Sequence, residues 1–235
     1  MNKENFIIEL QKLNINLTPK QISDLDYYCH FLIEYNQHTN LTAIKEENQV
    51  YLKHFYDSLT IVKGLDLSKY HNLIDIGTGA GFPGMVLKIV FPHLNITLLD
   101  SNNKKITFLQ QLAEKLNLTN INFFHGRAEE FCQKNRETFE IVTARAVSNM
   151  NTLAELCLPL VKKDYYFIAL KGSNKEEIID AQNAISILGG KIEKNIEFNL
   201  PIEDSGRNIV VIKKIKNTPN VYPRRYEKII KKPLK

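Results

Sequence analysis

The feature that most constrains the fold is an alternation of short apolar runs and helical patterns, which begins near residue 72. The stretches between the runs carry apolar residues at helical spacing, as at Ile106, Leu109 and Ala113. Strand–helix repetition of this kind predicts a mostly parallel sheet with helices on both faces. The predicted strands are residues 73–76, 95–100, 121–124, 139–143 and 165–170.

The end of the alternating region follows a different pattern. Ser173-x-x-Glu176 predicts the start of a helix, and Gly189-Gly190 predicts its end. Residues 191–200 and 208–215 are two strand patterns with only a loop between them, so we expect this pair to be antiparallel. The predicted fold class is therefore α/β and Rossmann-like, with a mostly parallel sheet and an antiparallel last strand.

The first 70 residues carry helical signals and no strand signal. Thr18-Pro19-Lys20-Gln21 is a capping box with proline at the first helical position. A second helix is predicted from about residue 47 to residue 63. We therefore divide the chain into an N-terminal helical region (1–70) packed on the sheet domain, an α/β domain (71–216) and a basic tail (217–235).

Composition excludes several classes of protein. No apolar run exceeds about six residues, whereas a membrane-spanning helix needs about 20. The N-terminus has no apolar segment followed by a small-residue cleavage site, so we expect a cytoplasmic protein. Cys29, Cys132 and Cys157 are scattered, with no Cys-x-x-Cys and no zinc-ligand spacing. We expect reduced, buried thiols and no metal site.

Charge is distributed unevenly along the chain. Of the formal net charge of +5, residues 213–235 contribute +8, from nine Lys or Arg and one acid, Glu227. Residues 1–212 therefore carry −3. A basic arm on a mildly acidic body is common in proteins that bind polyanions such as nucleic acids. The alternative is a tail that only keeps the protein soluble.

A glycine-rich loop, Asp75-Ile76-Gly77-Thr78-Gly79-Ala80-Gly81-Phe82-Pro83-Gly84, follows the first predicted strand. Glycines at a strand-to-helix turn let backbone N–H groups approach a ligand closely. Asp100 ends the second predicted strand, 23 residues after Gly77. A carboxylate there can accept hydrogen bonds from both ribose hydroxyls of a nucleoside cofactor.

Two classes of cofactor compete for this loop. A dinucleotide site needs Gly-x-Gly-x-x-Gly directly after the strand, and from Gly77 the sixth position is Phe82. The pattern fits from Gly79, but it then starts two residues late and contains Pro83. The Gly-x-Gly-x-Gly form that starts at Gly77 is the one that S-adenosylmethionine sites use, so we expect that cofactor; NAD or FAD, or a purely structural turn, are the alternatives. The predicted cofactor-binding residues of this part are Gly77, Thr78, Gly79 and Asp100.

Nearly the whole chain resembles the glucose-inhibited division protein B family, the 16S ribosomal RNA guanine-N7 methyltransferases. The glycine loop alone indicates only a methyltransferase, whereas the further motifs in this order are more specific. They are Asn40-Leu41-Thr42-Ala43, His54-x-x-Asp57-Ser58-Leu59, Leu98-Leu99-Asp100-Ser101, Gly126-Arg127-Ala128-Glu129, Ala144-Arg145-Ala146-Val147, Leu170-Lys171-Gly172, Arg207-Asn208-Ile209-Val210-Val211-Ile212 and Tyr222-Pro223-Arg224-Arg225.

The resemblance implies an S-adenosylmethionine-dependent methyltransferase fold and methylation of a guanine N7 in the 530 loop of 16S rRNA. It implies cofactor contacts by Gly77, Phe82, Ala128, Glu129 and Arg145. Two segments depart from the family pattern. Lys104-Lys105 stands where Lys-Arg is usual, and residues 225–230 replace a tail that usually carries Gly and Pro.

Attack by guanine N7 needs no proton transfer, because this nitrogen has a free lone pair. The reaction requires positioning and exclusion of water, and no general base. Methyltransferases that act on exocyclic amines typically carry an Asn/Asp-Pro-Pro-Tyr/Phe loop after the fourth strand. This chain has Thr143-Ala144-Arg145-Ala146 there, which argues against adenine N6 or an amide as the acceptor.

The side chains predicted to position the substrate are Arg145, Lys171 and His54. Arg145 and Lys171 follow the fourth and fifth strands, at the carboxyl edge where open α/β sheets bind ligands. Arg145 can donate to guanine O6, to a phosphate or to the cofactor carboxylate, or it forms a surface salt bridge. His54 and Asp57 lie one helical turn apart and share a face. We favour a structural or positioning role for them over a catalytic one.

The remaining candidates have two interpretations each. Ala128 and Glu129 follow the third strand and suit an adenine edge, or Glu129 is an exposed acid at a helix start. Phe82 covers the cofactor or packs in the core. Tyr222 and Tyr226 either stack on RNA bases or have no stacking role in RNA binding. The predicted RNA-binding residues are Arg207, Arg224, Arg225 and Lys228.

The expected partner is 16S rRNA or a small ribosomal subunit particle, with no membrane and no obligatory protein partner. Two rivals stay open. One is a methyltransferase that acts on a protein or a small molecule, for which the basic tail is unexplained. The other is a cofactor-binding ribosome interaction module without turnover, against which the intact Gly77, Gly79, Gly81 and Asp100 argue.

Overall fold

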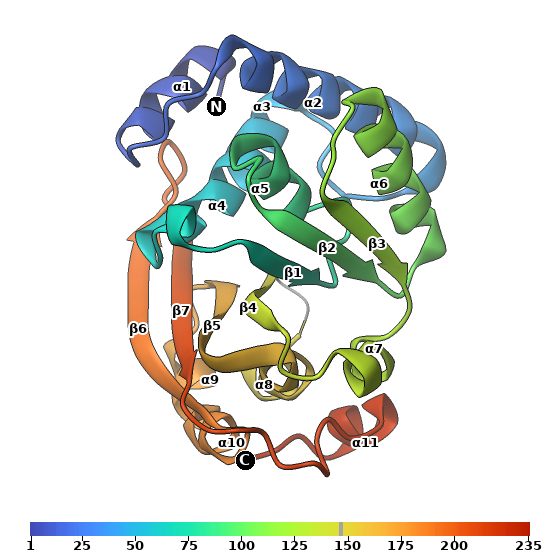
Figure 1. The fold of residues 1–235 in the computed structure, drawn as a ribbon. Coiled ribbons are helices and arrows are strands. Elements are labelled where there is room, and N and C mark those ends of the chain that lie inside the picture. The colour runs from blue at the N-terminus through green and yellow to red at the C-terminus, as the bar shows by residue number, and fades with distance from the viewer. Residues whose placement is uncertain (146–147) are drawn as a thin grey trace.

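The computed structural model describes residues 1–145 and 148–235, apart from the side chain of Lys175. Ala146 and Val147, which belong to one of the family motifs above, lie outside the described residues. The chain forms a twisted sheet between two layers of helices, with the N-terminal helices on one face and α11 (Tyr226–Lys231) on the other (Figure 1).

The first 69 residues are helical, as predicted. The longest helix, α2 (Pro19–Thr39), starts at the predicted capping box: Thr18 Oγ1 accepts from the Gln21 N–H, and Gln21 Oε1 accepts from the Thr18 N–H. The second predicted helix is continuous but changes its winding. Its parts are α3 (Glu47–Val50), a π-helical turn (Tyr51–Tyr56), α4 (Asp57–Leu59) and a 3-10 turn (Thr60–Lys63). The other elements here are α1 (Lys3–Gln11) and a 3-10 turn (Leu67–Lys69).

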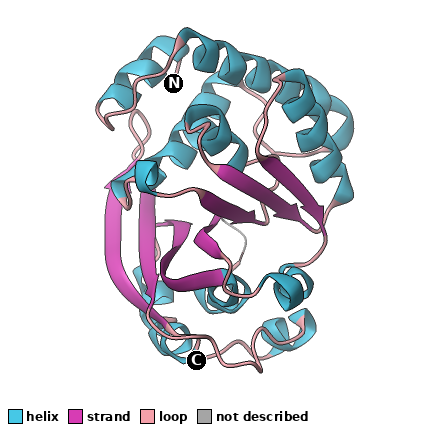
Figure 2. Cartoon of the chain, in the orientation of Figure 1, coloured by secondary structure: helices cyan, strands magenta, loops and turns pink. Residues whose placement is uncertain are grey.

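The sheet has seven strands in the order β3-β2-β1-β4-β5-β7-β6, drawn in magenta in Figure 2. The first five pair in parallel, whereas β7 is antiparallel to both of its neighbours. This topology confirms the predicted fold class. The strands are β1 (Asn72–Ile76), β2 (Asn95–Asp100), β3 (Ile121–His125), β4 (Phe139–Arg145), β5 (Val161–Gly172), β6 (Gly190–Asn199) and β7 (Gly206–Lys214).

Each face of the sheet has its own hydrophobic cluster. On one face, the N-terminal helices pack together with α5 (Gly84–Val90) and α6 (Asn103–Lys115). The other face is covered by α7 (Ala128–Asn135), α8 (Met150–Cys157), α9 (Lys175–Asp180), α10 (Gln182–Ile187) and α11. Because strand order reverses at β1 and β4, the carboxyl ends of these two strands form the switch point at which such sheets bind ligands.

The predicted start of the helix after β5 is wrong by one residue. The cap is Asn174, whose side-chain oxygen accepts from the Glu177 N–H, in place of Ser173 with Glu176. The helix is also divided at Ala181 into α9 and α10. Asn and Ser are equally good caps, so local sequence could not separate the two positions.

The C-terminal segment is docked onto the α7–α8 face. Ile229 of α11 is completely buried in that cluster. Arg224 donates to both carboxylate oxygens of Glu155, a completely buried residue of α8, at 2.7 and 2.5 Å. The Arg136 guanidinium donates to the carbonyls of Thr218, Pro219 and Tyr222. The domain boundaries proposed from sequence stay a prediction.

The three cysteines are free and buried, as expected. Burial raises the pKa of the Cys29 thiol to about 12 and that of Cys132 to about 11, so neither is a reactive thiolate near neutral pH.

Among the described residues, no helix combines the length and the hydropathy that crossing a bilayer requires.

Candidate active site

The glycine loop between β1 and α5 is held in shape by Asp75. One oxygen of this carboxylate, Oδ2, accepts from the Thr78 hydroxyl at 2.6 Å and from the Gly84 N–H at 2.8 Å. Complete burial raises the pKa of Asp75 to about 6, against the effect of these two hydrogen bonds. Gly81 has a φ of +105°, and a Cβ there would lie 2.6 Å from the Tyr28 hydroxyl. Only glycine fits at that position.

Asp100 ties the end of β2 to the same loop. Its Oδ2 accepts from the Gly79 N–H at 2.9 Å, and its Oδ1 accepts from the Asn102 N–H at 2.8 Å. Gly79 has a φ of +62°, a conformation that favours glycine, and the nearest atom to a Cβ placed there would be the Gly77 carbonyl oxygen at 4.0 Å. A carboxylate oxygen has two lone pairs, so Asp100 keeps acceptor capacity toward the cavity that it lines.

A cavity of about 630 Å³ opens at the carboxyl edge of the sheet, between the glycine loop and the N-terminal helices. It brings together residues from seven separate stretches of the chain. The predicted site residues that line it are His54, Gly77, Thr78, Gly79, Phe82, Asp100, Arg145, Lys171 and Arg207.

Arg145, at the end of β4, joins the sheet to the helical region. One terminal nitrogen, Nη1, donates to the Lys53 carbonyl at 2.7 Å and to Asp57 Oδ2 at 3.1 Å. The other, Nη2, lies 3.0 Å from His54 Nδ1. Thus the guanidinium is neither a surface salt bridge nor a free group, because it fixes three groups of one wall of the cavity.

His54 is held neutral by its surroundings. Burial, and then the charge of Arg145, lowers the pKa of His54 from 6.5 to about 3. Since Arg145 can only donate, Nδ1 is the acceptor, and the protonated Nε2 donates to the Thr42 hydroxyl at 2.9 Å. The predicted shared face of His54 and Asp57 is confirmed, but the two side chains meet through Arg145 and not through a direct hydrogen bond.

Asp57 is bound between two arginines. Arg207 Nε, from β7, donates to Asp57 Oδ1 at 3.0 Å, while Arg145 occupies Oδ2. Arg207 also donates to the Ser205 hydroxyl at 2.7 Å. Both oxygens of the carboxylate are therefore engaged by guanidinium groups, and two positive charges face one negative charge beside the cavity.

The Phe82 ring stacks with two other rings. The distance between ring centroids is 4.1 Å from Phe82 to His54 and 5.6 Å from Phe82 to Tyr28. Phe82 is only 5% exposed, so core packing is its main role, although it also lines the cavity.

Lys171, at the end of β5, donates to the Ser148 carbonyl at 2.6 Å and pairs with Glu177 at 2.7 Å.

Ala128 and Glu129 line a second, smaller cavity of about 110 Å³. It shares Gly77 and Ser101 with the large cavity, so the two are neighbours along the carboxyl edge. Glu129 accepts from Arg127 Nε at 2.8 Å and is therefore not a free acid at a helix start. Together the two cavities extend from β3 to β7.

The predicted RNA-binding residues do not lie together. Arg207 lines the large cavity, and Arg224 is used in the ion pair with Glu155. Arg225 and Lys228 are exposed on the C-terminal segment. Several residues of the cavity lining were not among the predicted site residues, and they include the polar side chains of Thr42, Lys53 and Lys105. Thr42 stands in a motif noted above, Asn40-Leu41-Thr42-Ala43, which was the one signal available for it.

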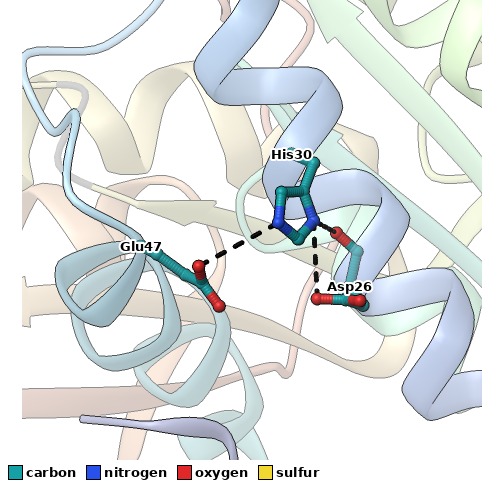
Figure 3. A group of neighbouring side chains, drawn as sticks. All are labelled: Asp26, His30 and Glu47. Carbon is teal, nitrogen blue, oxygen red and sulfur yellow. Dashed lines mark hydrogen bonds and ion pairs between the residues drawn. The ribbon is translucent and has the colours of Figure 1, made fainter.

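A separate group of titratable side chains lies on α2 and α3. The ligand atoms of Asp26, His30 and Glu47 lie within 4.8 Å of one another (Figure 3). Lys3 pairs with Asp26 and lies 3.8 Å from Glu47, so an ammonium group already offsets part of the negative charge of the two acids. None of these residues lines the cavities described above.

Comparisons with known proteins agree with this geometry. The family described as rRNA small subunit methyltransferase G (GidB) matches residues 21–205. The chain is 50% identical over 228 residues to the ribosomal RNA small subunit methyltransferase G of Bacillus subtilis, covering 96% of this chain and 95% of that one. The corresponding protein of Listeria monocytogenes (serovar 1/2a) is 48% identical over 228 residues, covering 96% of both chains.

Solved structures share the fold at low identity. A candidate methyltransferase of Bacillus halodurans has a TM-score of 0.54 and 12% identity, covering 68% of this chain and 99% of that chain. Precorrin-6y C5,15-methyltransferase of Geobacter metallireducens has a TM-score of 0.50 and 16% identity, covering 68% and 87%. The predicted enzyme class and cofactor are confirmed by the family match. The chain belongs to the rRNA small subunit methyltransferase G family, whose members are S-adenosylmethionine-dependent methyltransferases.

Proposed function

We propose that this protein transfers a methyl group from S-adenosylmethionine to N7 of a guanine in the 530 loop of 16S rRNA. The relatives that match nearly the full chain are ribosomal RNA small subunit methyltransferases, which supports rRNA as the substrate. The guanine, its N7 atom and the loop come from the resemblance of the motifs. Such a substrate would place the protein in the cytoplasm, with a small ribosomal subunit particle or its RNA as partner.

The structural observation that supports N7 as the acceptor atom is that the side chains in the large cavity that could act as a base are already engaged in hydrogen bonds. Within the described part of the chain, three titratable groups that line it could accept a proton: His54, Asp57 and Asp100. Arg145 takes the His54 lone pair, and two guanidinium groups take both Asp57 oxygens. Asp100 binds the glycine loop, and its remaining acceptor capacity is assigned to the cofactor ribose in this proposal. A ring nitrogen with a free lone pair is an acceptor that needs none of them as a base.

The residues present fit the cofactor. The sulfonium of S-adenosylmethionine supplies an electrophilic methyl group. Asp100 would accept the ribose hydroxyls, since its carboxylate retains lone pairs toward the cavity. The backbone at Gly77 and Gly79 would approach the cofactor closely, and Ala128 and Glu129 would meet the adenine edge in the smaller cavity.

The wall formed by Lys53, His54 and Asp57 would position the base. Arg145 fixes the Lys53 carbonyl, Asp57 and His54, which makes this wall rigid. Lysine and arginine side chains at the cavity would attract the phosphates next to the target. A base must leave its stack to enter such a cavity, so a loop is a better substrate than a helix. N7 would then attack the methyl carbon in line as the carbon–sulfur bond breaks, so that S-adenosylhomocysteine leaves as a neutral thioether and the positive charge passes to the purine ring.

Nucleoside mass spectrometry tests this function. The protein is incubated with S-adenosylmethionine and small-subunit RNA or particles that lack the modification. We expect new 7-methylguanosine, which nuclease mapping then places in the 530 loop. Cofactor binding without any methylated nucleoside, in every assembly state tried, would refute rRNA methylation and favour a protein or small-molecule acceptor.

The rate of methyl transfer is expected to be nearly independent of pH. Because the pKa of His54 lies at about 3, His54 stays neutral from pH 6.5 to 8.5 and cannot act as a titrating base there. At saturating RNA and cofactor, the single-turnover rate should change by less than about threefold over this range. A tenfold rise per pH unit, the signature of a base titrating with the rate, would contradict attack by a free lone pair.

A further inference from the structure

We propose that the C-terminal segment forms part of the cofactor site: Tyr226, held by Arg127, is a wall of the adenosine subsite and sets the affinity for the cofactor. This inference rests on the proposed function, because it takes the smaller cavity to be the place of the adenosine end. The inference gives Tyr226 a role in cofactor affinity, although the charge of the C-terminal segment predicts only RNA binding.

The lining of the smaller cavity is the first observation. Its walls come from the ends of β1 and β2, from the β3–α7 junction and from α8, and one residue of the C-terminal segment, Tyr226, joins them. Gly77, Ser101 and Ala128 lie in the same cavity. An aromatic ring beside a backbone edge is the combination that binds a purine, since the ring offers a face and the backbone offers hydrogen bonds.

Tyr226 is fixed in this place by Arg127. The guanidinium carbon of Arg127 lies 3.7 Å from the centroid of the Tyr226 ring. Arg127 in turn donates to Glu129, the residue predicted to meet the adenine edge. Tyr226, Arg127 and Glu129 therefore form one connected group, and all three also line a neighbouring cavity of about 450 Å³.

The rest of the segment is anchored independently of the ring. Arg224 binds the buried Glu155, and Ile229 is buried in the cluster against α8. These anchors lie on either side of Tyr226 in sequence, so they hold the segment in place when the ring is changed. Tyr226 itself also packs against that cluster, so the thermal unfolding of each variant is measured beside its binding.

The test compares cofactor binding by the full-length protein and its variants, measured by calorimetry. The probes are S-adenosylhomocysteine and 5′-methylthioadenosine, which has the adenosine end but lacks the amino-acid end. We expect Tyr226→Ala to weaken both by about the same factor, roughly tenfold, because base–aromatic stacking is lost from the end that they share. Tyr226→Phe should bind within about twofold of wild type, since the ring is retained.

Two further variants separate the wall from general destabilisation. Ile230→Ala changes an exposed residue of the same helix, and its dissociation constants should equal those of wild type. Tyr226→Leu preserves apolar volume without the ring, and it should weaken binding as Tyr226→Ala does. With the cofactor at saturation, Ile230→Ala should also keep the wild-type kcat for methyl transfer, because Ile230 is exposed and lines neither cavity of the proposed site.

The outcomes distinguish this inference from the proposed function. Suppose that the wild-type protein binds both probes, and that Tyr226→Ala and Tyr226→Leu bind them with the same affinity. This result would overturn the role of Tyr226 and leave the proposed function intact. A loss for S-adenosylhomocysteine but not for 5′-methylthioadenosine would also overturn it, because the contact would then not be with adenosine. If wild-type protein binds neither probe, the proposed function itself fails.

Discussion

Replacing Arg145 with alanine is expected to lower the kcat/KM of methyl transfer by about 100-fold or more while the chain stays folded. The guanidinium holds three groups of the helical wall, at Lys53, His54 and Asp57, against the carboxyl edge of the sheet. Without it this wall loses its link to the end of β4 and is held less firmly against the sheet. A reaction that depends on in-line geometry loses about 100-fold from a displacement near 1 Å.

The fold should survive because Asp57 is not left alone. Arg207 still donates to its other oxygen at 3.0 Å. The three lost hydrogen bonds cost about 1.5–3 kcal/mol each, or about 4.5–9 kcal/mol together, so the variant should be less stable than wild type and its activity is measured well below its melting temperature. Circular dichroism and thermal unfolding give the fold, and transfer of a labelled methyl group to unmodified small-subunit RNA gives the activity.

Arg145→Lys is the matched variant. Lysine preserves the charge but cannot reach three acceptors in the fixed geometry of a guanidinium, so we expect it to lose at least about tenfold in kcat/KM. Turnover at the wild-type level in a folded Arg145→Ala protein would remove Arg145 from the active site. Wild-type activity in Arg145→Lys alone would mean that charge, and not the hydrogen-bond network, is what matters.

Sequence patterns predicted the parts of this protein that depend on neighbours in the chain. The strands and the antiparallel end follow from period and turn signals, and the capping box at Thr18 needs only residues within one turn. The glycine loop can also be recognised from the sequence, because a tight strand-to-helix turn admits few residue types. Each of these signals is complete within about ten residues.

The partners of the charged groups could not be predicted in this way. Arg145 meets His54 across 91 positions, and Arg207 meets Asp57 across 150. Nothing local indicates that these four side chains share one network. The same holds for Arg224, which the charge of the basic tail predicted to bind RNA, but whose guanidinium lies in an ion pair with Glu155. Which charges remain free for a ligand is decided by the tertiary structure.

Neutralising four exposed charges of the C-terminal segment is expected to weaken RNA binding about 10- to 200-fold near 0.15 M salt. Each lysine or arginine that contacts a phosphate releases a counterion and adds about 0.7–0.9 to the slope of log K against log salt. Two to four such contacts would therefore reduce the slope by about 1.5–3.5. The variant combines Arg225→Gln, Lys228→Gln, Lys231→Gln and Lys232→Gln, all at exposed positions.

Substitution is a cleaner test than deletion of this segment. A truncation would also remove Ile229 and Arg224, and so expose the cluster against α8 and leave Glu155 buried without its partner. Loss of RNA binding in a truncated protein could then reflect unfolding of that face. The four glutamines leave these anchors in place, so the tail charge is the only feature that changes.

The matched control neutralises the same number of charges elsewhere, with Lys12→Gln, Lys20→Gln, Lys69→Gln and Lys115→Gln, which are also exposed. Three of these lysines pair with neighbouring acids, so they offer a phosphate less free charge. We expect the control to retain most of the wild-type salt slope, measured by RNA binding between 0.05 and about 0.3 M salt. Equal slopes in the two variants would mean that RNA responds to net charge alone, and that the C-terminal segment is not a phosphate-binding surface.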